Sequence, residues 1–119
     1  MPIPPSKTDL ADRVKAKVLD ADDLAYASAT FDAYTAARAA YAEHEALALD
    51  RQAASIRAQA AGGAPLVTDP REKLAARKAK LAFDAAAVDV DETAIDLGER
   101  YAVPNYHEID PKTGKLPGR

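Results

Sequence analysis

The sequence has no cysteine, no tryptophan, and only one methionine and two phenylalanines. Without cysteine the chain cannot form a disulfide framework, a thiolate metal site or a cysteine nucleophile. It also lacks an apolar run of the roughly 18 residues that a transmembrane helix needs. Its first residues, Met1 to Lys7, lack the apolar segment of a signal peptide. We therefore expect no membrane span and no secretion by a signal peptide.

Alanine supplies much of the apolar content. Hydrophobic residues make up 48% of the 119-residue chain, and 29 residues are alanine. A buried alanine removes little surface from water, whereas a buried leucine or phenylalanine contributes about 1.5–3 kcal/mol. One chain can therefore bury only a thin core, and we expect partner chains to complete it. The net charge of −3 gives the whole molecule no general attraction to nucleic acid.

The sequence predicts an all-α domain at residues 8–98 between two extended arms, residues 1–7 and 99–119. Pro2, Pro4 and Pro5 exclude a helix at the start of the chain. A short helix is expected at about residues 8–19, where apolar residues recur every fourth position. The acidic cluster at 20–23 either ends this helix and caps the next one, or lies on one continuous helix. Both alternatives stay open.

Two longer helices are predicted at about residues 22–61 and 70–97, forming an antiparallel, alanine-rich hairpin. The first has neither glycine nor proline before Gly62. The second begins with Asp69 as its N-cap, Pro70 in its first turn and Glu72 as the partner residue of a capping box. It either runs through the alternating Val88–Asp91 segment or breaks there and restarts.

Apolar residues recur every seventh position in both predicted helices. Folding the chain at the Gly62–Pro65 turn brings Ile56 level with Leu74 and Leu49 level with Leu81. Val88 then meets Ala42. The predicted hairpin core is therefore Leu49, Ile56, Leu74, Leu81 and Val88.

A second stripe, which includes Phe83, lies about 200° around the second helix from the first. The short first helix, the C-terminal arm or another subunit would have to cover it. The arm carries apolar anchors, and its Asp110–Gly114 segment has the composition of a turn. The residues predicted to bind a partner are Phe83, Val90, Leu97, Tyr101, Tyr106, Ile109 and Leu116.

Charges are arranged in blocks. Residues 21–50 and 84–99 are acidic, whereas residues 51–80 around the predicted hairpin tip are basic. One interpretation is a solvated face with ion pairs one turn apart. Another is contact between subunits through complementary patches. Contact with an acidic partner or nucleic acid is a weaker alternative, for which the candidate residues are Arg57, Arg71, Arg77 and Lys78.

No catalytic, cofactor-binding or metal-binding constellation is recognised. His44 lies between two glutamates whose side chains point in other directions, and His107 lies on the C-terminal arm. Gly62 and Gly63 are typical of a helix end and not of a phosphate-binding loop. We therefore predict no enzyme activity, no cofactor and no small-molecule ligand.

These features predict a structural subunit or assembly factor that packs against other protein chains in the cytoplasm or a virion. A compact helical body with arms at both ends occurs in capsids, connectors and tails, which is an analogy of layout alone. A homo-oligomer or multi-subunit assembly is expected, without membrane contact, and nucleic acid is not the expected partner. The alternative is a small regulatory module, such as a chaperone, antitoxin or adaptor, whose C-terminal arm folds onto one target.

Overall fold

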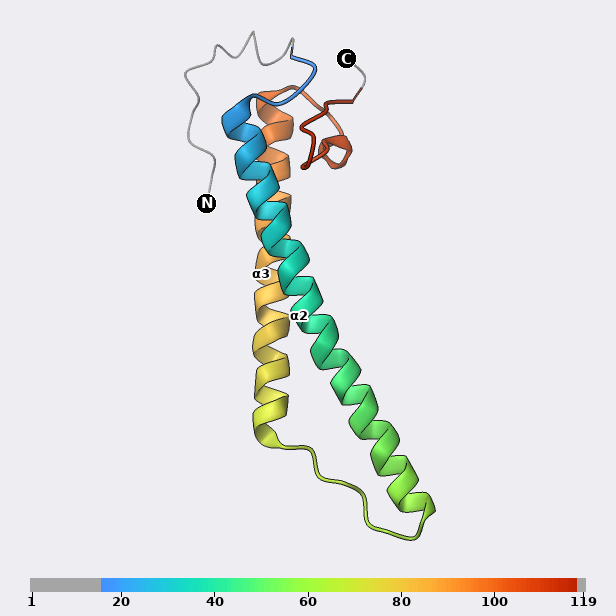
Figure 1. Cartoon of the computed structure of the whole chain (residues 1–119). Coiled ribbons are helices and arrows are strands. Elements are labelled where there is room, and N and C mark those ends of the chain that lie inside the picture. Colours follow the sequence, from blue (N-terminus) through green and yellow to red (C-terminus); the bar gives the residue numbers. More distant parts are fainter. Residues whose placement is uncertain (1–15, 118–119) are drawn as a thin grey trace. The chain divides into compact units, whose positions relative to one another are not determined.

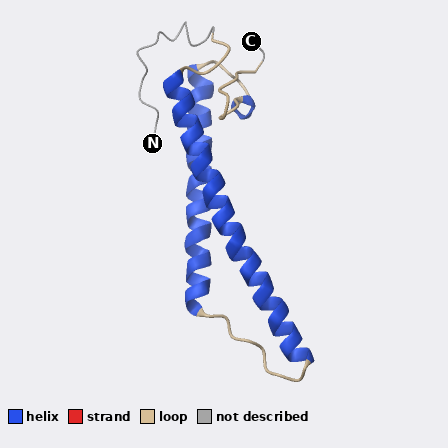
Figure 2. Ribbon diagram, viewed as in Figure 1, coloured by secondary structure: helices blue, strands red, loops and turns tan. Residues whose placement is uncertain are grey.

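The computed structural model describes residues 16–117, which form an antiparallel hairpin of two long helices (Figure 1). Helix α2 spans Ala21–Ala60, helix α3 spans Pro70–Arg100, and a single 3₁₀ turn, η1, spans Tyr106–Glu108. Over the described range Figure 2 contains helices and loops but no strand. The predicted all-α hairpin is confirmed.

Local capping chemistry sets both helix starts. The Asp20 carboxylate accepts the Asp23 N–H at 2.9 Å, so α2 begins directly after Asp20. The Asp69 carboxylate accepts the Arg71 N–H, also at 2.9 Å, and Pro70 is the first residue of α3. The acidic cluster at 20–23 is therefore a helix start, and Asp69 is the N-cap that the sequence predicts.

Both helices end in the same hydrogen-bonded turn, a Schellman motif. At the end of α2, Gly62 has a φ of +88°, and the Gly63 N–H donates to the Ala58 carbonyl at 2.8 Å. At the end of α3, Ala102 takes the same position with a φ of +54°, and the Val103 N–H donates to the Gly98 carbonyl at 2.8 Å. Because α3 is uninterrupted to Arg100, the alternative of a break at 88–91 is excluded.

The predicted N-terminal helix at 8–19 lies outside the described residues up to position 15, as does the 1–7 arm. Its last four residues, 16–19, are not helical. Val18 instead forms an isolated antiparallel bridge with Lys115. The Leu19 N–H donates to the Gly114 carbonyl, and the Leu116 N–H donates to the Lys17 carbonyl. Backbone pairing with the C-terminal segment thus replaces the predicted end of this helix.

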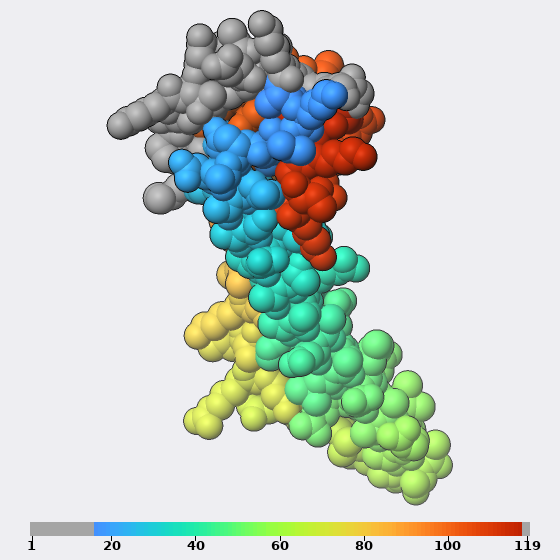
Figure 3. All heavy atoms as spheres, turned by 45° about the horizontal axis from the view of Figure 1, so that its top comes forward, coloured from blue at the N-terminus to red at the C-terminus, as the bar shows by residue number. Residues whose placement is uncertain are grey.

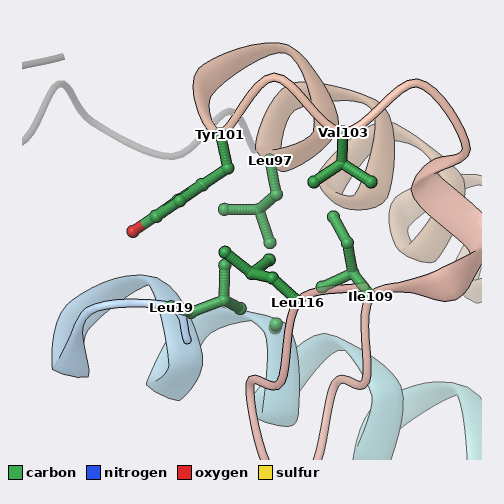
Figure 4. Packing of buried hydrophobic residues seen from close by; sticks show 7 residues of the cluster. Leu19, Leu97, Tyr101, Val103, Ile109 and Leu116 are labelled. Atoms are coloured by element: carbon green, nitrogen blue, oxygen red, sulfur yellow. The ribbon is translucent and has the colours of Figure 1, made fainter. Parts of the chain in front are cut away.

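The described residues divide into two compact units. The terminal unit comprises the residues up to Tyr34 and from Ala86 onward, and the middle unit comprises Thr35–Ala85. The hydrophobic core belongs to the terminal unit (Figure 4) and consists of Leu19, Ala27, Leu97, Tyr101, Val103, Ile109 and Leu116. The segment after α3 therefore contributes four of these seven side chains to its own chain's core.

In the middle unit the two helices meet through a ring stack and an ion pair. The rings of Tyr41 and Phe83 lie 5.8 Å apart at 25°. Further along, Arg51 Nη2 lies 2.8 Å from Glu72 Oε1. The loop that follows α2, residues 61–69, is exposed throughout.

The predicted hairpin core is wrong in this structure. Its members, Leu49, Ile56, Leu74, Leu81 and Val88, are each between 50% and 67% exposed. In the predicted register Tyr41 would lie level with Asp89, but it stacks on Phe83. In the middle unit the helices thus meet at Phe83, a member of the second stripe, because Tyr41 of α2 supplies a large ring that stacks on it.

Candidate interaction surfaces

A buried polar anchor joins the two helix ends of the terminal unit. Tyr101 is 0% exposed, and its hydroxyl donates to Asp23 Oδ2 at 2.6 Å while accepting the Asp20 N–H at 3.0 Å. Arg100 adds a longer ionic contact to Asp23 at 3.8 Å and a 3.2 Å contact to Asp96. Burial raises the pKa of Tyr101 above its ordinary value. The protonated phenol therefore keeps the proton that it donates to the buried Asp23 carboxylate.

The C-terminal segment turns back onto the start of α2, as the space-filling view also shows (Figure 3). Its turn is the predicted one, because the Gly114 N–H donates to the Asp110 carbonyl at 2.8 Å. Backbone N–H groups, first that of Lys112, lower the pKa of the Asp110 carboxyl. The Ser28 hydroxyl donates to the Pro111 carbonyl at 2.7 Å and ties this turn to α2.

Close packing fixes the segment at its other end. A Cβ atom added at Gly98 would lie 2.9 Å from the Cβ of Tyr106, so α3 requires glycine at this point of contact. Four residues that we predicted to bind a partner are therefore wrongly assigned, since they lie in the chain's own core. These are Leu97, Tyr101, Ile109 and Leu116.

A small apolar cleft of about 180 Å³ opens in the surface of the terminal unit. Val90 and Tyr106, two more of the predicted partner-binding residues, are half-buried at its wall, together with Phe31. The Lys112 ammonium lies 5.6 Å from the centre of the Phe31 ring. Phe83, the remaining predicted residue, lies instead in the Tyr41 stack.

Four exposed aliphatic side chains lie in a line along α3, which we call the outer stripe: Leu74, Leu81, Val88 and Ile95. Their seven-residue spacing places them on one face of the helix, about 120–180° around it from Phe83. Each is between 42% and 67% exposed. On α2, Leu49 and Ile56 are exposed to a similar degree. Exposed aliphatic side chains that line up on one helix face are a feature of many protein interaction sites.

Charge changes sign along α3. The first third carries five basic residues against Glu72, namely Arg71, Lys73, Arg77, Lys78 and Lys80. Residues 84–99 carry no basic residue and six acidic ones, namely Asp84, Asp89, Asp91, Glu92, Asp96 and Glu99. Of the residues proposed for acidic partners, Arg71, Arg77 and Lys78 belong to the basic block and Arg57 lies in the last turn of α2. All four are exposed.

A broad groove of about 750 Å³ runs along the middle unit beside the inter-helix loop. His44 and Leu66 lie in its wall, and Arg51 and Glu72 pair across it. Within residues 16–117 no three acidic or histidine side chains gather closely enough to hold a metal ion. Neither described helix is sufficiently long and apolar to cross a membrane.

Comparison of the chain with models of protein families, with curated protein sequences and with solved structures finds no match. Its function is therefore argued from its own residues. The two features with the clearest capacity for binding are the outer stripe and the charge blocks beside it.

The sequence identified three members of the outer stripe, Leu74, Leu81 and Val88, but predicted them as an internal core. It missed the Tyr101–Asp23 anchor, because nothing in the local sequence links residues 78 positions apart. Tyrosine and aspartate are common on helix surfaces, and only the packed helix ends give this pair its role.

Proposed function

We propose that this chain is a non-enzymatic structural subunit or assembly factor that works by packing α3 against another protein chain. The observation that carries the proposal is the outer stripe. A stable monomer does not benefit from four large aliphatic side chains in line on its surface, since each exposes apolar area to water. A partner helix that covers them would gain roughly 1 kcal/mol or more for each well-buried side chain.

The mode of binding differs from the one that the sequence predicts. The C-terminal segment contributes Tyr101, Ile109 and Leu116 to the chain's own core, so these side chains do not serve as anchors on a neighbour. Its place in the proposal is to hold the helix ends together, so that α3 is presented as a fixed surface. The expected setting remains the cytoplasm or a virus particle, as a capsid, connector or tail component.

The regulatory-module alternative rests on an apolar C-terminal arm that folds onto one target. Since those apolar side chains are buried in the terminal unit, no observation among residues 16–117 favours it. Contact with nucleic acid through the basic block also has no specific support. The acidic block on the same helix would repel a phosphate backbone laid along α3.

Site-specific photo-crosslinking tests the proposal. A benzophenone amino acid replaces Leu81 in the full-length chain, which is expressed in its natural host and irradiated before lysis. A protein crosslink, to this chain or to another, is expected at Leu81. The control places the same group at Ala39, an exposed residue of α2. If Leu81 gives no protein adduct, or gives only what Ala39 gives, the outer stripe is not a binding surface and the proposal is wrong.

A further inference from the structure

We infer that the partner of the outer stripe is a second copy of this chain, with the two α3 helices antiparallel about a twofold axis between Asp84 and Ala85. The inference rests on the proposed function, because it names the partner of the same surface. It involves α3 alone, one uninterrupted helix of 31 residues.

The spacing of the stripe identifies the partner as a helix. A strict seven-residue repeat keeps apolar side chains facing a neighbouring helix when the pair winds with a left-handed twist. The four residues, from Leu74 to Ile95, span about 32 Å of α3 at roughly 1.5 Å per residue. A second α3 offers a stripe of the same length and the same spacing.

One antiparallel register matches the two stripes from end to end. It sets Leu74 level with Ile95 of the second copy and Leu81 level with Val88 of the second copy. Twofold symmetry repeats both contacts, so all eight aliphatic side chains of the two stripes are covered. Ala85, which lies next to the axis on the same side of α3 as the stripe, allows the two backbones to approach closely.

The same register aligns charges that were not used to choose it. Arg77 lies level with Glu92 of the second copy, and Lys78 lies level with Asp91 of the second copy. A parallel pair would set each block beside itself, basic against basic and acidic against acidic. Charge therefore selects the antiparallel arrangement.

One like-charge contact opposes this arrangement. Asp84 lies next to the axis and meets Asp84 of the second copy. Lys80 is one turn before it on the same helix and therefore reduces the repulsion. The two pairs of opposite charge that flank the stripe, Arg77 with Glu92 and Lys78 with Asp91, occur twice in the dimer, whereas the Asp84 contact occurs once, so the balance favours association.

Charge reversal in two complementary variants tests the inference. The full-length chain is measured by analytical ultracentrifugation as wild type, as R77E/K78E and as D91K/E92K. The wild type is expected to be a dimer, and each variant to dissociate at least about tenfold more readily, because like charges then meet at both ends. An equimolar mixture should form a heterodimer, since each reversed block meets its opposite. The control, E43K/E45K, reverses two exposed charges on α2 and should leave the wild-type mass unchanged.

Each outcome has a distinct meaning. A wild type that stays monomeric at about 1 mM overturns the second-copy inference, since a dimer weaker than this gains only about 4 kcal/mol. If the Leu81 crosslink then joins a different protein, the proposed function stands; if there is no crosslink, both fail. A dimer that neither variant weakens, or that mixing does not restore, overturns the antiparallel register. Circular dichroism of each variant checks folding, and the single changes K78E and D91K replace a double variant that does not fold.

Discussion

The Tyr101 hydroxyl donates a 2.6 Å hydrogen bond to the carboxylate of Asp23, and both side chains are at most 1% exposed. The bond joins the residue that directly follows α3 to the first turn of α2. It leaves the Asp23 carboxylate with a donor inside the protein, where an unpaired charge would be costly. The pair is therefore the polar centre of the terminal unit, and its strength can be measured.

Replacing Tyr101 with phenylalanine should lower the free energy of unfolding by about 1–3 kcal/mol, because the buried Asp23 carboxylate loses its short hydrogen bond. Urea titration followed by circular dichroism measures the change. Tyr41→Phe is the matched control, since it removes the same hydroxyl from a half-buried ring and keeps the stack on Phe83. We expect less than about 0.5 kcal/mol there. Equal losses at the two positions would contradict a special role for the Tyr101 pair.

Stability should also fall at alkaline pH. Burial raises the pKa of Tyr101 in the folded chain above its ordinary value of 10.0, so the unfolded chain releases this proton first. The stability that this difference in pKa contributes is fully present below pH 10 and is lost as the pH rises above 10. Urea titrations from pH 8 to about 11 should show a steeper decline for the wild type than for Tyr101→Phe. Parallel curves for the two proteins would show that this phenol does not govern the decline.

The two Schellman turns predict opposite effects of exchanging glycine and alanine. Ala102 has a φ of +54°, a conformation that favours glycine, so Ala102→Gly should stabilise the chain by about 0.5–1 kcal/mol. Gly62 has a φ of +88° in the equivalent turn of α2, and Gly62→Ala should destabilise by about 1–2 kcal/mol. Thermal unfolding measures both. A destabilising Ala102→Gly would mean that the methyl group makes a contact that outweighs the backbone effect.

The two faces of α3 should differ in their contribution to the isolated chain. Phe83→Ala removes a half-buried ring from the Tyr41 stack and should cost about 1–3 kcal/mol. Leu81→Ala alters a side chain that is 67% exposed and should cost less than about 0.5 kcal/mol. Urea titration is carried out at a low concentration, at which ultracentrifugation finds only the single chain. A larger loss for Leu81 would restore the hairpin core that the sequence predicts.

Local chemistry in the sequence determined the elements of this fold. Asp69 and Pro70 specify where α3 begins, Gly62 specifies where α2 ends, and the Asp110–Gly114 turn follows from its residue types. Each of these features depends on backbone hydrogen bonds over a few residues, so a local pattern contains the information. The amino-acid order also determined that α3 has two apolar stripes.

Only the tertiary structure decided which stripe faces α2. Periodicity defines a face of a helix but not its partner, and both stripes of α3 repeat every seven residues. Tyr41 stacked on Phe83, and Arg51 paired with Glu72, select the observed register and leave Leu74 and Leu81 exposed. Long-range packing likewise decided where the C-terminal segment lies. Leu19 and Leu116 meet in one core because the helix ends bring distant parts of the chain together, which no local sequence pattern specifies.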